Sequence, residues 1–480
     1  MKSIFKRIKG ILLSVVLIFT AILPLYGCES EEADVIVLRI SNWEEYIDEG
    51  DWDEGDLIEL EDGTEIFSEN GLIEDFEEWF YENYGKRVRV EYSTFGTNEE
   101  LYNQLTMGDT YDLVCPSEYM IMKMIAEDMV IPFSEGFFDE SMETNYYIKG
   151  LSPYIREVYD ELSIDGKILS DYAAGYMWGT LGIVYNPEFV TEEEAKHWDI
   201  LMNEKFYKQI TIKDSVRDAF FAGNSIYHFS KITEEEFINS SSYSHELSKM
   251  LNDTNKETVD GVEDILARIK DNVYSFETDS GKADMVTGKV VANQQWSGDA
   301  VYTLDQAEED GVILCYSAPE EATNLWFDGW VMLESGIKGD ADKQMAAEAF
   351  VNFISMPESV IRNMMYIGYT SVIAGGESDL ILQYIDWCYG ADEEEKETME
   401  YSVDYFFLGR NNELIGKTDE YTIVTSSDQT NRQLFAQYPT EDVIERSVVM
   451  AYFDSEGNER INRMWTNVRC FDLEKWWNGQ

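Results

Sequence analysis

Aromatic and acidic residues occur together at five places in the chain, each directly after an apolar run. The segments are "NWEEY" (42–46), "PSEY" (116–119), "DSVRD" (214–218), "WSGD" (296–299) and "WFD" (326–328). An aromatic face attracts an ammonium group by roughly 0.5–2 kcal/mol, and a desolvated carboxylate is tolerated mainly where a cation pairs with it. The five segments therefore predict a site for a ligand that has ammonium ends and an apolar stem.

An aliphatic polyamine has this character, and the residues that could bind it supply either a ring or a polar group. They are Trp43, Glu45, Tyr46, Ser117, Tyr119, Asp214, Arg217, Asp218, Trp296, Asp299, Trp326 and Asp328. Alternate side chains of an extended segment point in opposite directions. We therefore expect Glu45 to face the ligand and its neighbour Glu44 to face solvent.

Other kinds of chemistry have weaker support in the sequence. There is no G-x-S-x-G motif and no glycine-rich phosphate loop, and the histidines at 197, 228 and 245 lack metal-ligand spacing. We expect no cofactor, no metal and no enzymatic activity. A secreted glycoside hydrolase would need only two carboxylates, so hydrolysis remains an alternative function, as does binding of a different organic cation.

Two acidic segments, 48–70 and 391–401, interrupt the pattern of strands and helices. We interpret both as inserted, solvated loops. Asp51, Asp53 and Asp56 suggest a calcium-binding loop, but Gly55 is misplaced for an EF-hand and the closing glutamate is not at the required spacing. A weak calcium site there stays an open alternative.

The overall charge limits the classes of partner. The 480 residues include 36 Lys and Arg against 95 Asp and Glu, which gives a formal net charge of −59 at pH 7. Such a surface repels nucleic acid phosphates and anionic lipid headgroups, so we expect no nucleic acid partner. The length suits two lobes of ordinary size, each with its own core.

The N-terminus predicts export. A basic start, "MKSIFKRIKG", precedes an apolar run over residues 11–25 that ends at "LYGC", as in a secretory signal. The end of the run is similar to a bacterial lipobox, in which Cys28 would become the acylated first residue. We therefore expect a signal peptide over residues 1–28 and an extracytoplasmic protein lipid-anchored to the outer face of the cell membrane. A simple membrane-anchor helix is the alternative.

The four other cysteines, Cys115, Cys315, Cys388 and Cys470, are isolated in the sequence and form no C-x-x-C motif. This spacing indicates neither zinc nor a dense disulfide framework. One disulfide among them is left open.

Strand and helix patterns alternate from residue 35 onward. Apolar β-rich runs predict strands at 35–41, 86–94 and 111–117, and helical periodicity predicts helices at 71–85, 98–108 and 119–130. This alternation is typical of an α/β sheet with parallel neighbouring strands, in which ligands bind beyond the carboxyl ends of the strands.

Two apolar stretches are long enough to cross between lobes. They are "ILSDYAAGYMWGTLGIVYN" (168–186) and "NLWFDGWVMLES" (324–335). A further strand with a polar, glycine-containing exit is expected within 288–300, and a helix pair within 342–369. No internal repeat is visible.

Seven segments, taken in order, resemble the spermidine/putrescine solute-binding family, the polyamine-binding lipoproteins of ABC importers. They are "LRISNWEEYI", "YDLVCPSEYMIMKM", "YMWGTLGIVYN", "IKDSVRDAF", "NQQWSGDAV", "WFDGW" and "FVNFISMPESVIRNMMYIGY". The resemblance is strong over residues 36–371, weaker from there to about residue 430, and faint beyond. It implies the two-lobed periplasmic-binding-protein (type II) fold, an α/β fold with a hinge and a ligand cleft between the lobes.

The resemblance also implies roles for individual residues. Trp43, Tyr46, Tyr119, Trp296, Trp326 and Tyr369 would form an aromatic box around the methylene chain. Glu45, Asp218, Asp299 and Asp328 would meet the ammonium groups, and Ser117 would add a hydrogen bond. Arg217 would orient neighbouring acids, with an ordinary surface salt bridge as the alternative.

The implied partners are a polyamine, the ABC permease with its ATPase, and the membrane through the lipid anchor. We expect the protein to be monomeric. The implied domains are lobe 1 at 35–172 and 328–430, and lobe 2 at 173–327, with a C-terminal helical segment at 431–480 assigned to lobe 2.

The chain departs from spermidine-type members at two positions. It has Ser215 where they carry an aspartate, and Asp299 where they carry a small polar residue, which is more similar to putrescine-type members. Asp218 is also shorter than the family's usual glutamate. The choice between putrescine and spermidine therefore stays open.

Overall fold

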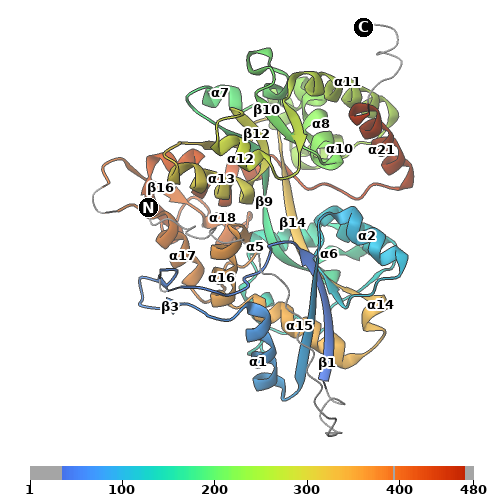
Figure 1. Ribbon diagram of the computed structural model, residues 1–480, viewed down its shortest axis with the longest axis vertical. Coiled ribbons are helices and arrows are strands. Elements are labelled where there is room, and N and C mark those ends of the chain that lie inside the picture. The colour runs from blue at the N-terminus through green and yellow to red at the C-terminus, as the bar shows by residue number, and fades with distance from the viewer. Residues whose placement is uncertain (1–34, 54, 393–394, 471–480) are drawn as a thin grey trace, which may run out of the picture.

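Two long strands, β9 (Ala173–Tyr185) and β14 (Thr323–Leu333), run side by side through the centre of the molecule and join two lobes (Figure 1). The computed structural model describes residues 35–53, 55–392 and 395–470. The predicted signal peptide and Cys28 lie outside these residues. We call the lobe with β1 lobe 1 and the lobe with β10 lobe 2; they are the lower and upper lobes of Figure 1.

Lobe 1 is built on parallel strands, as predicted. β1 (Val35–Trp43) lies between β4 (Arg87–Phe95) and β5 (Leu113–Val114) and is parallel to both. β14 then pairs antiparallel with β5 and with β9. Every side chain of β9 and β14 is buried, which explains why both strands are almost continuously apolar in sequence.

The three helices expected in this lobe are confirmed. They are α1 (Leu72–Tyr84), α2 (Asn98–Met107) and α3 (Glu118–Ala126). α1 buries Leu72, Phe76 and Phe80, which are spaced one turn apart, and stops at Gly85, whose left-handed φ of 66° suits glycine. The third helix is shorter than predicted, because Val130–Ile131 leaves it to pair with β14 as strand β6.

Lobe 2 contains a second set of strands and helices. β10 (Ile210–Lys213) is parallel to β11 (Ser275–Glu277) and β12 (Ala292–Trp296). The helices include α8 (Val216–Ile232), α11 (Lys256–Asn272) and α13 (Ser297–Glu309). Near the end of the chain, α21 (Ser455–Arg469) packs on α11 and α8. Its apolar residues Ile461, Met464 and Val468 belong to the same buried cluster as Ile210 and Leu266.

The crossing strands predicted from the sequence are confirmed by the strand pairing. Residues 173–180 of β9 pair with β14, and residues 181–185 pair with β12. Gly179 lies at this change of partner, where a Cβ atom would come within 2.3 Å of the Ser297 hydroxyl and 2.5 Å of the Trp326 ring. Glycine is therefore required where the two lobes come together.

The predicted helix pair at 342–369 is also confirmed, as α15 (Ala341–Ile354) and α16 (Pro357–Ile367). The other strands are β2 (Ile58–Glu59), β3 (Glu65–Ile66), β7 (Ser163–Ile164), β8 (Lys167–Ile168), β13 (Cys315–Ser317), β15 (Thr370–Ser371), β16 (Thr398–Ser402), β17 (Thr422–Ser426) and β18 (Ser447–Val448). The other helices are α4 (Tyr146–Gly150), α5 (Pro153–Glu161), α6 (Leu169–Tyr172), α7 (Glu192–Ala195), α9 (Glu235–Ile238), α10 (Tyr243–Leu251), α12 (Gly281–Val286), α14 (Glu334–Ile337), α17 (Leu380–Tyr389), α18 (Asp404–Leu408), α19 (Gln433–Gln437) and α20 (Glu441–Glu445), with short 3-10 turns at Trp198–Met202, Glu204–Phe206 and Ser427–Asn431.

The interpretation of the first acidic segment as a solvated loop is wrong for its apolar residues. β2 and β3 form a small hairpin, and Trp52, Ile58 and Leu60 are buried in the core of lobe 1. The Arg362 guanidinium also fixes the start of the segment, with Nε 2.8 Å from the buried carboxylate of Asp48. The apolar residues alternate with acids, so one face packs inward while the other meets water.

The second acidic segment is also more ordered than predicted. Its last residues enter β16, which pairs antiparallel with β17. This small sheet and α17 lie on the flank of the molecule in Figure 1.

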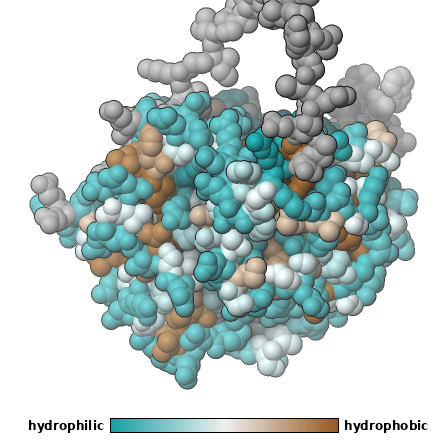
Figure 2. All heavy atoms as spheres, turned by 90° about the horizontal axis from the view of Figure 1, so that it is seen from below, coloured by the Kyte–Doolittle hydropathy of each residue, from teal (hydrophilic) through white to brown (hydrophobic). Residues whose placement is uncertain are grey.

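The surface reflects the acidic composition. The face of lobe 1 seen in Figure 2 is largely hydrophilic, with hydrophobic patches scattered over it. Over the described residues, the helices contain none that is both long and apolar enough to cross a membrane. The four cysteines outside the N-terminus are free, three of them buried and Cys470 exposed.

Candidate functional site

Most of the predicted site residues lie close to the junction of the lobes, at the carboxyl ends of strands. Ser117 precedes α3, Asp218 lies in the first turn of α8, and Asp299 lies in the first turn of α13. The N-terminus of a helix stabilises a negative charge. Strand-to-helix turns thus place two of the predicted acids, Asp218 and Asp299, where their charges are tolerated.

Asp328, in the middle of β14, is the best-defined polar group of the site. Its Oδ1 accepts a hydrogen bond of 2.7 Å from the Ser117 hydroxyl, and its Oδ2 accepts one of 2.9 Å from the Tyr46 hydroxyl. The residue is 7% exposed. Within residues 35–53, 55–392 and 395–470 no ion pair forms with it, so this buried carboxylate has neutral partners only.

Burial raises the pKa of Asp328 to about 6, even though the hydrogen bonds from Ser117 and Tyr46 favour the ionised form. A second carboxyl group, Glu118, lies next to it and accepts a hydrogen bond of 3.4 Å from the Phe327 amide. Burial raises the pKa of Glu118 to about 8. At neutral pH this part of the site therefore carries close to one negative charge, on Asp328.

Aromatic rings connect Asp328 to the second acidic group of the site. Tyr369 makes edge-on contacts with Tyr46 at 5.2 Å and with Trp326 at 5.6 Å between ring centroids. A Cβ atom on Gly298 would lie 2.4 Å from the Tyr369 ring. The glycine of the Trp-x-Gly segment is therefore needed so that this ring can pack directly against the start of α13.

Asp299 has different partners from Asp328. Its Oδ1 accepts a hydrogen bond of 2.9 Å from the Tyr369 hydroxyl. Two lysines also pair with it, Lys213 with Nζ 3.5 Å from Oδ2 and Lys282 with Nζ 3.6 Å from Oδ1. The carboxylate that was predicted to meet a ligand ammonium is thus already paired with cations of the protein itself.

Lys213 is almost fully buried at this end of the site. Its ammonium lies 3.5 Å from Glu277, donates to the Thr278 carbonyl at 3.0 Å, and sits 4.4 Å from the centroid of the Trp296 ring. The side chain of Lys213 is 1% exposed and that of Glu277 is 2% exposed. Asp218 is buried nearby, and burial raises its pKa, opposed first by polar interactions with Ser215 and Trp296 and then by the charges of Lys213 and Arg217.

Arg217 is buried and forms no surface salt bridge in the described part of the chain, and its charge acts to lower the pKa of both Glu118 and Asp218. Its guanidinium lies over the rings of Tyr119 at 4.4 Å and Phe453 at 3.9 Å, and it donates to the Ala451 carbonyl at 2.6 Å. Tyr119 in turn is held by Asn98, whose amide also bonds to Ser117. Arg217 therefore connects the first turn of α3 in lobe 1 to the C-terminal segment.

Three predicted residues do not enter these contacts: Trp43, Glu45 and Asp214, whose carboxylate pairs with Arg469 at 2.6 Å. The Trp43 ring packs against Phe95 at 4.7 Å between centroids. Glu45 is exposed in a tight turn with a φ of 52°, and no contact with the other predicted residues is recorded within the described ranges. Glu44 is exposed as predicted, so the two glutamates share an environment that the sequence analysis had expected to differ.

The sequence analysis missed Lys213, Glu277, Lys282 and Glu118. A charged residue ending the apolar strand "ITIK" was the available signal for Lys213, since a lysine at that position must either reach water or be paired. Nothing local signals Glu277 and Lys282, because the ion pairs that they form, Glu277 with Lys213 and Lys282 with Asp299, depend on how β10, β11, α12 and α13 come together.

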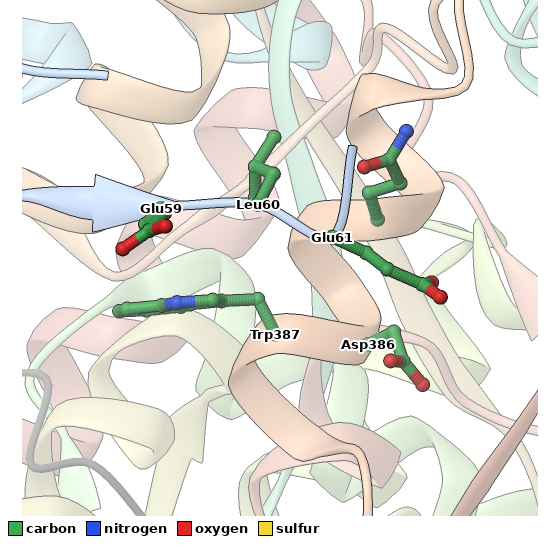
Figure 3. Close-up of a pocket in the computed structure, with 6 residues that line it drawn as sticks. Glu59, Leu60, Glu61, Asp386 and Trp387 are labelled. Atoms are coloured by element: carbon green, nitrogen blue, oxygen red, sulfur yellow. The ribbon is translucent and has the colours of Figure 1, made fainter. Parts of the chain in front are cut away.

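A pocket elsewhere on lobe 1 is also rich in acids. It has a volume of 350 Å³ and lies between the β2 hairpin and α17, lined by Glu59, Leu60, Glu61, Gln383, Asp386 and Trp387 (Figure 3). Repulsion by Glu61 adds to burial in raising the pKa of Asp386. None of the predicted site residues lines this pocket.

Comparison with known proteins shows the family of this chain. The sequence profile of the family described as "Bacterial extracellular solute-binding protein" matches residues 71–379. The chain belongs to this family. The matched range contains both crossing strands and both acidic groups, Asp328 and Asp299.

Individual relatives of this solute-binding protein are distant but cover much of the chain. It is 25% identical over 294 residues to the putrescine-binding periplasmic protein PotF of Escherichia coli, an alignment covering 59% of this chain and 71% of PotF. It is 25% identical over 343 residues to the putrescine-binding periplasmic protein SpuD of Pseudomonas aeruginosa, covering 68% and 76%.

The fold is shared with a solved structure. The spermidine/putrescine ABC transporter substrate-binding protein PotD of Streptococcus pneumoniae superposes with a TM-score of 0.56 at 24% identity, covering 90% of this chain and 98% of PotD. The two-lobed type II fold predicted from the sequence is thereby confirmed.

Proposed function

We propose that this protein is the extracytoplasmic solute-binding component of an ABC importer, which captures polyamines, putrescine and/or spermidine, and delivers them to its permease. The observation that carries the proposal is the Asp328 carboxylate, buried among the rings of Tyr46 and other aromatic residues with neutral hydrogen-bond donors only. A buried ionised carboxylate is destabilising without a cation. The ammonium group of a ligand would supply that cation.

The names of the relatives support the same ligand class, since PotF and SpuD are both called putrescine-binding. The family consists of solute-binding proteins, so we propose a role in binding without catalysis and without a cofactor.

We propose that the ligand contacts the residues predicted from the sequence, with Asp328 at one ammonium and the rings around the stem. The proposed set is Trp43, Glu45, Tyr46, Ser117, Tyr119, Asp218, Trp296, Asp299, Trp326, Asp328 and Tyr369. Within it, Asp328, Ser117, Tyr46, Tyr369, Trp326 and Asp299 have the strongest support, because direct contacts connect them in sequence. Glu45 has the weakest support because it is exposed.

Isothermal titration of purified, ligand-free protein with putrescine and with spermidine tests the proposed function. Saturable binding of at least one of them, absent for an uncharged diol of the same length, is the expected result. No saturable heat with either amine, from a sample shown to be folded by circular dichroism, would overturn it. A chain carrying Asp386→Asn in the outer acidic pocket is the matched control and should bind as the parent does.

Delivery to a permease requires the lobes to separate and close. We propose that they do so as the units predicted from the sequence, 35–172 with 328–430 and 173–327 with 431–480, about the crossing strands. Small-angle scattering with and without putrescine tests this, and we expect a smaller radius of gyration with the ligand. Unchanged scattering at saturating ligand would contradict it.

We further propose that Cys28 carries a lipid that anchors the monomeric protein to the outer face of the membrane, beside the permease. Cys28→Ala should move the protein from the membrane fraction to the soluble extracytoplasmic fraction. Retention of the variant in the membrane fraction would contradict the anchor without affecting the proposed ligand.

A further inference from the structure

The two carboxylates of the site, Asp328 and Asp299, differ in whether the protein itself supplies a cation. Asp328 has hydroxyl donors only, from Ser117 and Tyr46. Asp299 is paired with Lys213 and Lys282, 3.5 Å and 3.6 Å away. A ligand ammonium therefore finds an uncompensated charge at Asp328 and a compensated one at Asp299.

The pairing of Lys213 is enclosed, unlike an ordinary surface salt bridge. Its side chain is 1% exposed, against 45% for Lys289, which pairs with Asp284 in the same lobe. The Lys213 ammonium contacts Glu277, Asp299 and the Thr278 carbonyl, and it lies over the Trp296 ring. Two carboxylates, a carbonyl and an indole face are what a buried alkylammonium group requires.

Removing one partner of a buried ion pair leaves the other charge unpaired and is strongly unfavourable. Lys213 is therefore held in place by Glu277 and Asp299 together. Lys282 adds a further positive charge. Burial alone would lower the pKa of Lys282, but the carboxylates of Asp299 and Asp279 outweigh burial and raise that pKa. Glu277 also accepts hydrogen bonds from the Gly281 amide and from Asn293, which fixes it independently of any ligand.

We propose that Lys213 is a specificity-determining residue, whose ammonium occupies the position at Asp299 and Glu277 that the second ammonium of a diamine would need. The site then recognises one ammonium end of its ligand, at Asp328, and is nearly indifferent to charge at the other end. The substrate class widens to aliphatic amines with a single free ammonium end, including polyamines whose other end is acylated. This inference rests on the proposed function, because it assumes that an amine binds at Asp328.

A continuous row of aromatic rings connects Asp328, where the ligand ammonium would bind, to Asp299, where the Lys213 ammonium lies. Tyr46 donates to Asp328, its ring touches Tyr369, and Tyr369 donates to Asp299. A stem lying along these rings from Asp328 would reach the Asp299 end, where it meets the Lys213 ammonium. Two ammonium groups close together repel each other, and this repulsion offsets what the second charge of a diamine would otherwise gain.

The test compares putrescine with 1-aminobutane, which has the same stem and a single ammonium group. In a site that pairs both ammonium groups, losing one charge should weaken binding by about thirtyfold or more. We expect the wild-type protein to bind the two compounds with dissociation constants within about tenfold of each other. A preference for putrescine greater than tenfold would overturn the inference while leaving the proposed function intact.

Lys213→Met removes the competing ammonium and keeps an apolar stem against Trp296. Asp299 and Glu277 would then lack their shared cation, and the second ammonium of putrescine could supply it. The quantity to compare is the dissociation constant of 1-aminobutane divided by that of putrescine. We expect this ratio to be at least about tenfold larger in the variant than in the wild type. Putrescine should also raise the melting temperature of the variant more than 1-aminobutane does, which a merely structural role of Lys213 would not produce.

Two further variants keep the test decisive. Lys289→Met makes the same change at the exposed lysine and should leave the ratio of affinities unchanged. Lys213→Gln is the alternative if the methionine variant does not fold, and the wild-type ratio decides the matter if neither folds. An unchanged ratio in a folded Lys213 variant would overturn the inference. If neither amine binds the folded wild-type protein, the proposed function fails and the inference fails with it.

Discussion

The two acidic groups of the site are similar in composition and opposite in electrostatics. Asp328 and Asp299 both accept a hydrogen bond from a tyrosine hydroxyl, yet Asp328 has no cation beside it in the described structure, whereas Asp299 has two. Under the proposed function, a carboxylate beside aromatic rings is an amine-binding position only where the protein has not already neutralised it. The following predictions test this comparison, beginning with the largest expected effect.

Replacing Asp328 by asparagine should have the largest effect. The ligand ammonium would remain desolvated without its charge partner, which typically costs about 2–5 kcal/mol, or about thirtyfold or more in dissociation constant. Titration calorimetry with putrescine and with 1-aminobutane measures the loss, which should be similar for both.

The same change at Asp299 sharpens the comparison. Because Asp299 is paired within the protein, Asp299→Asn should weaken binding of 1-aminobutane by at most about fivefold. An equal or larger loss than for Asp328→Asn would show that the amine binds at Asp299, and the comparison between the two ends would be wrong.

Asp328→Asn should also stabilise the ligand-free protein. The pKa of the carboxyl group is about 6 in the folded state, above its ordinary value near 4 in an unfolded chain. The folded state thus binds the proton more tightly, and the ionised form destabilises it above pH 6 by up to about 3 kcal/mol. Denaturant unfolding at pH 7 should show a gain for the variant, and the gain should disappear below about pH 4. A loss of stability at pH 7 would contradict the assignment of Asp328 as an uncompensated charge.

Amine binding should weaken in mild acid. Between pH 6 and 7 Asp328 is largely ionised and the dissociation constant should be nearly constant, whereas below pH 6 each unit should weaken binding about tenfold. The groups facing Asp328 are Ser117, Tyr46 and the largely protonated Glu118, whose pKa of about 8 lies outside this window. Affinity that is constant down to pH 4.5 would place the amine at a carboxylate with an ordinary pKa.

Tyr46→Phe should have a smaller effect than Asp328→Asn. It removes one of the two hydrogen bonds that favour the ionised carboxylate, so the pKa of Asp328 should rise further and the onset of weakening should move to higher pH. We expect a loss of about threefold to tenfold at pH 7, in line with the roughly 0.5–1.5 kcal/mol that one hydrogen bond contributes. Tyr102→Phe, whose hydroxyl bonds to Glu127 away from the site, is the matched control and should behave as the parent.

Much of the fold and part of the site could be predicted because the signals are local. The buried strand pattern of β9, the helical spacing of Phe76 and Phe80, and the rings and acids at strand ends all lie within short segments. The cation environment of Asp299 could not be predicted in this way. Lys213, Lys282 and Asp299 come from separate elements, and only the packed structure brings their charges together.

Two further features of the structure have no signal in the local sequence. Glu45 was expected to face the ligand on the assumption of an extended segment, but the chain turns there with a positive φ. Arg217 was expected to orient acids, and its additional stacking on Phe453, more than two hundred residues further along the chain, was not predicted. Neither the turn nor the long-range contact has a signal in the local sequence.

A crystal structure of the protein with putrescine tests the central claim most directly. We expect one nitrogen of the ligand about 3 Å from the Asp328 carboxylate, with Lys213 still paired with Asp299 and Glu277. A ligand nitrogen bound to Asp299 with Lys213 displaced, or no nitrogen near Asp328, would contradict the account.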